Sequence, residues 1–413
     1  MRSLAKTAAI LGLMVLCTQL HAATAYTSYS TFNLAFQSYG FKLGEYFDGL
    51  PAGSEATSFG MLGIGAEGLG SDGANSSELL PVTTDAYSAS TSPNSIGAES
   101  SQGQFLAGNG DRIVFQFDCP VYAFGLYLIG NPSPTGDPAI PFWRMHAFNS
   151  HGFDAYSATT PVRNYSEGND LYFLGIISAS DPFERVDLYS DNDLAAVFSF
   201  SIDNVKVGTT AQTVSLADAK SVATGERVIV SDLAVMRNHA SRFNVETHDR
   251  AVGIAVLGSG PTRGVDVDFL GAVESTGDGE RVIRLIHLVD VMQATPPGTL
   301  HVATRALGGG TALGLQPACS GSFGPNNIGL DATICGRVTA VATDHSWITV
   351  DDGAGRDSGM GSLGVKVVGE FWGNGLAVGN LVRLTGSSSM FASGGSYYPL
   401  LRVASPLDVH RLL

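Results

Sequence analysis

Acidic and amide side chains interrupt one of the clearest strand patterns in the sequence. The segment FSFSIDNVKVG, residues 198–208, alternates apolar and polar positions until Asp203 and Asn204 stand where the alternation should continue. One interpretation is a β-bulge or turn, in which these side chains hydrogen-bond nearby backbone groups. The other is a calcium site, because calcium binds roughly six to eight oxygens from carboxylates and backbone carbonyls. The sequence leaves both interpretations open.

Aromatic rings next to loops are a second group of residues that could bind a ligand, since sugars and bases both stack on exposed rings. Packing within the loops is the alternative. The candidate ligand-binding residues are Trp143, Trp372, Tyr397 and Tyr398. By contrast, Phe243 and Trp347 alternate with apolar neighbours and are expected in the core.

Motifs that would indicate catalysis are weak or missing. GIGAEG, residues 63–68, matches G-x-G-x-x-G, but LGSDGANSS follows and cannot begin the helix that a pyrophosphate site requires, so we expect a flexible loop. The sequence has no G-x-S-x-G, H-E-x-x-H or EF-hand pattern. His248 and Asp249, like Asp344 and His345, are expected to be solvated turn residues. A hydrolase with an unrecognised carboxylate pair remains the alternative.

The N-terminus has the three parts of a secretory signal peptide, namely basic MRSLAK, an apolar run from Ala8 to Cys17, and the small residues of LHAATA. We therefore expect residues 1–25 to be removed and the mature protein to be secreted, periplasmic or held at the cell surface. No later segment reaches the roughly 18 to 20 apolar residues of a spanning helix.

The composition is acidic and rich in small residues. Lys and Arg number 23 against 38 Asp and Glu, which gives a formal net charge of −15. Phosphate backbones are poor partners for such a surface, so nucleic acid is not expected as a partner. The 51 glycines and the 15% of charged residues favour many short strands joined by tight turns.

Three cysteines remain once Cys17 leaves with the signal peptide. Their spacing matches no zinc-ligand pattern. Because an export compartment permits disulfides, we predict one between Cys319 and Cys335, with Cys119 left as a buried free thiol.

The chain is predicted to be all-β, with an N-terminal jelly-roll β-sandwich over residues 26–208 followed by two OB-type five-stranded barrels. The barrels span residues 209–300 and 331–413, and a Gly- and Pro-rich connection covers residues 301–330. The sandwich is indicated by several strands at regular spacing, for example Ile113, Phe115 and Phe117 on one face of DRIVFQFDCP. SLADAKSV, near the start of the first barrel, is expected to form a short helix.

An internal repeat supports the two barrels. Each copy contains a strand, a short turn, a strand with an aromatic residue, an acidic turn and a further strand that reads GIAV or GVKV. A fourth strand, predicted to end at Gly271 or Gly386, and a fifth strand complete each copy. Five strands in this order are typical of a small OB-type barrel.

Two resemblances follow from these motifs. FDGLPAG, VFQFDCPVYAFGLYL, PFERVDLYS and FSIDNVKVG together resemble the jelly-roll modules of exported bacterial proteins of the PEP-CTERM type. In such modules an acidic residue of an early strand joins one of the last strand, which makes Glu45 and Asp48 the expected calcium partners of Asp203 and Asn204. The repeat resembles OB-fold modules of exported bacterial proteins.

The expected function is therefore non-catalytic binding outside the cell, with an extracellular polysaccharide as the ligand and a structural calcium in the jelly roll. Single-stranded nucleic-acid binding through the barrels is an alternative. It is disfavoured because NVETHDRAVG and TVDDGAGRDSG place acidic residues beside the groove that would bind a strand.

Overall fold

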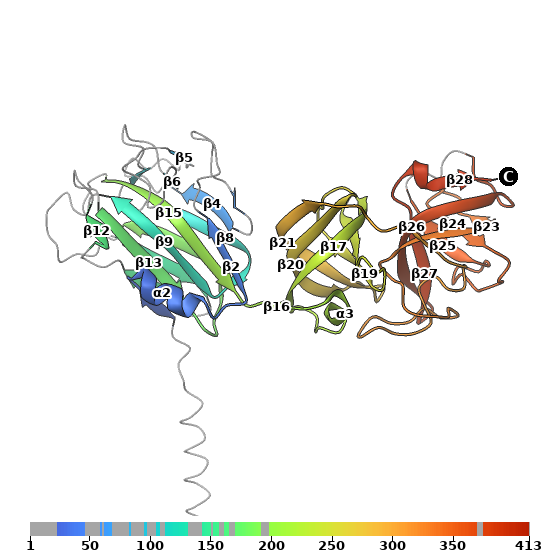
Figure 1. Ribbon diagram of the computed structural model, residues 1–413, viewed down its shortest axis with the longest axis horizontal. Helices are drawn as coiled ribbons and strands as arrows, with labels where there is room; N and C mark the ends of the chain where they lie inside the picture. The colour runs from blue at the N-terminus through green and yellow to red at the C-terminus, as the bar shows by residue number, and fades with distance from the viewer. Residues whose placement is uncertain are drawn as a thin grey trace, which may run out of the picture. The chain divides into compact units, whose positions relative to one another are not determined.

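The computed structural model divides the chain into two compact units, Met1–Thr210 and Ala211–Leu413, two residues from the boundary predicted after residue 208 (Figure 1). The residues it describes are 23–45, 58–59, 62–67, 82–83, 95–96, 105–107, 112–130, 143–149, 152–156, 161–164, 170–190, 198–369 and 375–412. Strands dominate both units, so the prediction of an all-β chain is confirmed. None of the described helices is long and apolar enough to cross a membrane.

The first unit contains two sheets. In order of pairing, the strands of the first sheet are β1 (Thr24–Tyr26), β13 (Asp170–Ile177), β9 (Ala123–Gly130), β15 (Phe198–Thr209), β6 (Ser95–Ile96) and β5 (Val82–Thr83). Three further strands pair with this sheet: β12 (Arg163–Asn164) pairs with β13, and both β2 (Phe41–Glu45) and β7 (Phe105–Ala107) pair with β15. The second is β11 (Phe153–Tyr156), β10 (Trp143–Phe148), β14 (Phe183–Ser190), β8 (Arg112–Val121), β4 (Leu62–Glu67) and β3 (Ser58–Phe59). Thr24 and Ala25 lie in β1, so the sheet begins before residue 26.

The two sheets pack face to face, as a sandwich requires. The predicted alternation of β8 is confirmed, because Ile113, Phe115 and Phe117 are buried. The ring centroids of Phe115 and of Phe124, on β9 of the other sheet, lie 4.8 Å apart. GIGAEG was expected to be a loop, but residues 62–67 form β4 beside β8. The apolar positions that alternate with its glycines explain why it forms a strand.

Helix α2 (Tyr29–Phe36), which the sequence analysis missed, covers the outer face of the first sheet. It buries Phe32 and Phe36 against the sheet. Glycines make room for these rings: a Cβ at Gly175 would lie 2.7 Å from Cδ2 of Phe32, and one at Gly208 would lie 2.8 Å from Cε2 of Phe36. The position of the helix therefore depends on residues far along the chain.

The second unit contains two sheets whose main strands pair in the same order. In each sheet the first and fourth main strands also pair, which closes the sheet into a barrel. The first barrel is β16 (Gln212–Thr213), β17 (Arg227–His239), β18 (Arg242–Glu246), β19 (Gly253–Leu257), β21 (Arg281–Gln293) and β20 (Val265–Ser275), which pairs back with β17; the short helix α3 (Leu216–Ala219) lies between β16 and β17 in the chain. The second barrel is β22 (Leu300–His301), β23 (Asp331–Val341), β24 (Trp347–Asp351), β25 (Val365–Val368), β27 (Ser396–Arg402), β26 (Leu381–Ser393) and β28 (Val409–Arg411), with β26 also paired to β23, and the 3-10 helix η1 (Pro406–Asp408) precedes β28.

Two glycines of the repeat lie inside strands and not at their ends, which corrects the prediction. Gly271 is within β20 and Gly386 within β26. A Cβ at Gly271 would lie 2.2 Å from Cγ2 of Ile283, and one at Gly386 would lie 2.3 Å from the carbonyl oxygen of Arg402. Both glycines therefore allow the fifth strand of each barrel to approach the fourth closely, as glycine does at barrel bends.

The predicted disulfide is absent, because Cys319 and Cys335 are both free thiols. Cys319 is buried with Ile328 and Met390, whereas Cys335 is exposed on β23. Closeness along the chain does not bring the two sulfurs together, since the strand fixes Cys335 on the barrel surface. Cys119 is buried, as expected.

Candidate functional site

The Asp203–Asn204 pair lies at a β-bulge of β15. The register against β9 shifts between Asp203 and Lys206, and Asn204 has a φ of 53°. The backbone N–H of Asn204 donates to Oδ1 of the buried Asp203 at 2.6 Å. Of the proposed calcium partners, Glu45 pairs with Val205 through the backbone, and Asp48 lies outside the described residues. The bulge accounts for the sequence pattern, and the calcium site stays a prediction.

The predicted aromatic candidates do not form a common surface. Trp143 is only 1% exposed, because it begins β10 on the face that packs in the core, so its assignment to ligand binding is wrong. Trp372 lies outside the described residues. Tyr397 and Tyr398 belong to β27 and are partly buried. The Tyr398 ring lies 5.8 Å from that of Phe391, which favours packing over a ligand platform.

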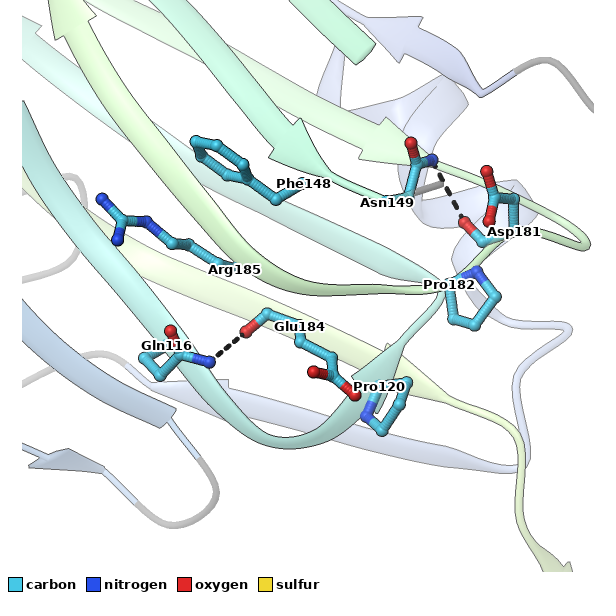
Figure 2. Close-up of a pocket in the computed structure, with 8 residues that line it drawn as sticks. All are labelled: Gln116, Pro120, Phe148, Asn149, Asp181, Pro182, Glu184 and Arg185. Carbon is cyan, nitrogen blue, oxygen red and sulfur yellow. Dashed lines mark hydrogen bonds between the residues drawn. The ribbon is translucent and has the colours of Figure 1, made fainter. Parts of the chain in front are cut away.

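The first unit instead presents an open pocket of about 560 Å³ at the ends of three neighbouring strands (Figure 2). We call it the strand-end pocket. Its lining residues are Gln116, Pro120, Phe148, Asn149, Asp181, Pro182, Glu184 and Arg185. They come from β8, from the end of β10 and from the start of β14, so an aromatic ring, two amides and three charged groups meet in one place.

Strand pairing explains how residues so far apart in sequence converge. Phe148 is opposite Arg185 across β10 and β14, and Arg185 is opposite Gln116 across β14 and β8. Directly paired residues project to the same face of a sheet. The register between β14 and β8 shifts between Phe183 and Arg185, and such irregularities re-aim side chains at sheet ends.

Phe148 is the aromatic centre of the pocket and is 43% exposed. The guanidinium carbon of Arg185 lies 5.1 Å from its ring centroid. The imidazole of His146 meets the same ring edge to face at 4.5 Å. Arg185 is in turn held by Asp187, with Nε to Oδ1 at 2.6 Å and Nη2 to Oδ2 at 2.9 Å. The ring is thus fixed by its neighbours while one side stays accessible to solvent.

Polar groups line the rest of the pocket. The Gln116 side chain donates from Nε2 to the carbonyl oxygen of Glu184 at 2.8 Å, and Asn149 donates from Nδ2 to the carbonyl oxygen of Asp181 at 3.3 Å (Figure 2). These bonds orient the two amides through backbone oxygens. The amide oxygens and the carboxylates of Asp181 and Glu184 are hydrogen-bond acceptors.

A charged cluster continues along the same face of β10 and β11. Arg144 donates to Asp154 from Nε at 2.9 Å and from Nη2 at 2.6 Å, and Nδ1 of His146 lies 2.7 Å from Oδ1 of Asp154. The hydrogen bonds from Arg144 are the main cause that lowers the pKa of Asp154, with His146 adding to it. Asp154 is therefore held as a carboxylate that positions His146 beside Phe148.

The described lining of the pocket contains no serine, cysteine or histidine. An exposed ring bordered by planar amides and carboxylates is chemically suited to binding a polar ring with hydroxyl groups.

The sequence analysis missed these residues although Phe148 and Asn149 were part of a recognised strand. The available signal was an aromatic residue followed by an amide at a strand end, with Asp181, Pro182 and Glu184 before a second strand. Their convergence depends on the pairing of β10 with β14, which the sequence does not state. Comparison of the chain with protein-family models, with curated proteins and with solved structures found no match in any of the three.

Proposed function

We propose that the protein is an exported, non-catalytic carbohydrate-binding protein whose first unit holds a polysaccharide in the strand-end pocket. The observation that carries this proposal is the partly exposed Phe148 ring, fixed by Arg185 and His146 and bordered by Gln116 and Asn149. Sugar rings stack their C–H faces on such aromatic surfaces, while amides and carboxylates bond the hydroxyls.

The fold types predicted from sequence are part of this proposal. A jelly-roll assignment is supported by two antiparallel sheets in the first unit. An OB-type assignment is supported by the pairing order of the five main strands in each barrel, 1-2-3-5-4 closing on 1, with parallel pairing of the third and fifth strands. Export is supported by the signal-peptide pattern of residues 1–25.

Nucleic acid is a weaker candidate for the ligand. The net charge of −15 disfavours a phosphate backbone. In the second barrel the groove beside β23 and β24 is lined by Asp351 and Asp352 as well as Arg337, so it offers no continuous basic track.

The test is a polysaccharide panel screened by affinity electrophoresis, followed by Phe148→Ala on the glycan that retards the full-length protein. We expect the variant to bind at least about tenfold more weakly, equivalent to about 1.4 kcal/mol, because the stacking surface is lost. Phe323→Ala is the matched control, since Phe323 is also exposed and also lies below an arginine, Arg305 at 5.5 Å.

Three outcomes would contradict the proposal. The pocket is not the sugar site if Phe148→Ala binds as well as the unaltered protein. Binding that falls steeply with salt points to a polyanion. Release of reducing ends from the bound glycan would establish a hydrolase instead of a binding protein.

A further inference from the structure

Three metal-ligating side chains converge on the first barrel of the second unit. They are Asp232 of β17, His248 in the turn after β18, and Asp266 of β20. One ligand atom from each lies within 4.8 Å of the others. Sequence analysis expected His248 to be a solvated turn residue, because nothing in the sequence places two strand carboxylates beside it.

The distances in this cluster fit a small tetrahedral cation. Nε2 of His248 lies 3.1 Å from Oδ2 of Asp266 and 3.6 Å from Oδ1 of Asp232. Two ligands bound about 2.0 to 2.1 Å from zinc at a tetrahedral angle are about 3.3 to 3.4 Å apart. The two separations from Nε2 of His248 bracket this value, and the two carboxylate oxygens lie within 4.8 Å of each other.

The carboxylate oxygens of the cluster outnumber the hydrogen-bond donors that face them. Nε2 of His248 carries at most one hydrogen, yet two carboxylate oxygens face it. Oδ1 of Asp266 is buried and has no hydrogen-bond partner among the described residues. A buried acceptor without a donor is costly.

The backbone holds Asp232 in place for this role. Its φ is 58°, at the point where the pairing of β17 with β20 shifts register between Val230 and Leu233. Its N–H donates to Oδ1 of Asp268 at 2.8 Å. The bulge therefore turns the Asp232 carboxylate toward His248.

We propose that Asp232, His248 and Asp266 form a binding site for a divalent transition-metal ion, with Zn²⁺ as the best fit. One imidazole and two carboxylates are an N and O ligand set that zinc accepts, and three protein ligands leave one position for water or another ligand. Calcium is disfavoured because it prefers roughly six to eight oxygen ligands. The ion would join β17, β20 and the turn after β18.

The experiment uses the full-length protein after treatment with chelator, with Co²⁺ as a spectroscopic probe and Zn²⁺ as competitor. We expect visible d–d absorption at one equivalent of Co²⁺, without a thiolate charge-transfer band, and its loss when Zn²⁺ is added. His248→Asn and Asp232→Asn should each weaken binding by about 100-fold or more, since losing a direct ligand costs at least as much as losing its hydrogen-bond partners.

The control is His345→Asn, which alters an exposed histidine in a turn of the second barrel. It should leave the Co²⁺ spectrum and the Zn²⁺ affinity unchanged. The side chains of His248 and Asp232 are 42% and 81% exposed, so their variants should fold, which the thermal midpoint checks. Either of two results overturns the proposal: Zn²⁺ and Co²⁺ fail to bind at millimolar concentration, or their binding survives His248→Asn.

Discussion

At the scale of single residues, the bulge of β15 shows how one backbone angle explains a pattern that suggested metal chemistry. Asn204 adopts a φ of 53°, which L-residues other than Asn, Asp and Gly seldom tolerate. Its backbone N–H donates a short hydrogen bond to Oδ1 of the buried Asp203. An Asp–Asn pair in a strand is therefore explained by conformation before any ligand is invoked.

This explanation predicts the effect of changing Asn204. Asn204→Gly should leave the stability of the first unit within a few tenths of a kcal/mol, while Asn204→Val should cost about 1 to 2 kcal/mol because of its left-handed conformation. Denaturant unfolding of the full-length protein measures both. Equal stability of the two variants would contradict the bulge.

The full-length protein also allows a test for a bound calcium ion. A site filled at 100 times its dissociation constant contributes about 2.7 kcal/mol, so excess chelator would lower the thermal midpoint by a few degrees. If that response occurs and disappears in Asp203→Asn, the pair ligates calcium in addition to forming the bulge.

At the scale of elements, helix α2 is fixed by the sheet beneath it. Its aromatic residues recur three and four positions apart, at Tyr29, Phe32 and Phe36, and so share one face of the helix. Phe32 lies 5.3 Å from Phe36 and 5.2 Å from Phe173 between ring centroids. An eight-residue helix has little stability alone, so this packing must supply it.

Filling the space beneath the helix should therefore destabilise the first unit. Gly175→Ala places a methyl group 2.7 Å from the Phe32 ring, and we expect a cost of about 1 to 3 kcal/mol from overpacking. Gly277→Ala is the control, because nothing lies within 4 Å of its added Cβ. Unfolding midpoints in denaturant give the comparison. A neutral Gly175→Ala would mean that α2 does not pack on the sheet as described.

At the scale of the whole molecule, buried charges join the two barrels of the second unit. Nε of Arg237 on β17 lies 2.7 Å from Oδ1 of Asp331 on β23, and the backbone N–H of Asp331 donates to Oε2 of Glu246 at 3.1 Å. The other oxygen of Glu246 is buried and has no hydrogen-bond partner within the described part of the chain. Nζ of Lys220 donates to the carbonyl oxygen of Ile328 at 2.7 Å. The barrels are therefore linked by groups whose charge depends on pH.

Two of these groups have opposite pH effects. Burial raises the pKa of Glu246 from 4.5 to about 7, and burial lowers the pKa of Lys220 from 10.5 to about 7. Between pH 4.5 and 7 the folded state holds a proton on Glu246 that the unfolded state has lost, so stability falls as pH rises. Between pH 7 and 10.5 the unfolded state holds the extra proton on Lys220, so stability rises.

We therefore expect these two groups to give the second unit its lowest stability near pH 7, with Glu246 accounting for about 3 kcal/mol across its window. Glu246→Gln should reduce the loss of stability between pH 4.5 and 7. Glu226→Gln changes an exposed position and should leave this loss unchanged. Hydrogen exchange of the barrel strands as a function of pH measures this. An unchanged slope in Glu246→Gln would show that Glu246 is ionised in the folded state.

The sequence by itself determined the all-β class and indicated individual strands. Hydrophobic alternation and turn residues are local signals, and DRIVFQFDCP or GIAV carries them whatever surrounds it. The sequence also identified Asp203 and Asn204 as unusual positions in a strand, but it does not distinguish a bulge from a metal ligand.

Only the tertiary structure decided which distant residues meet. Phe148 joins Arg185 because β10 pairs with β14, and Asp232 joins Asp266 across a bulge. Cys319 and Cys335 stay apart although they are close in sequence, because a strand fixes one on the surface while the other packs in a small core. Strand order and register arise from packing the whole sheet, so no single segment encodes them.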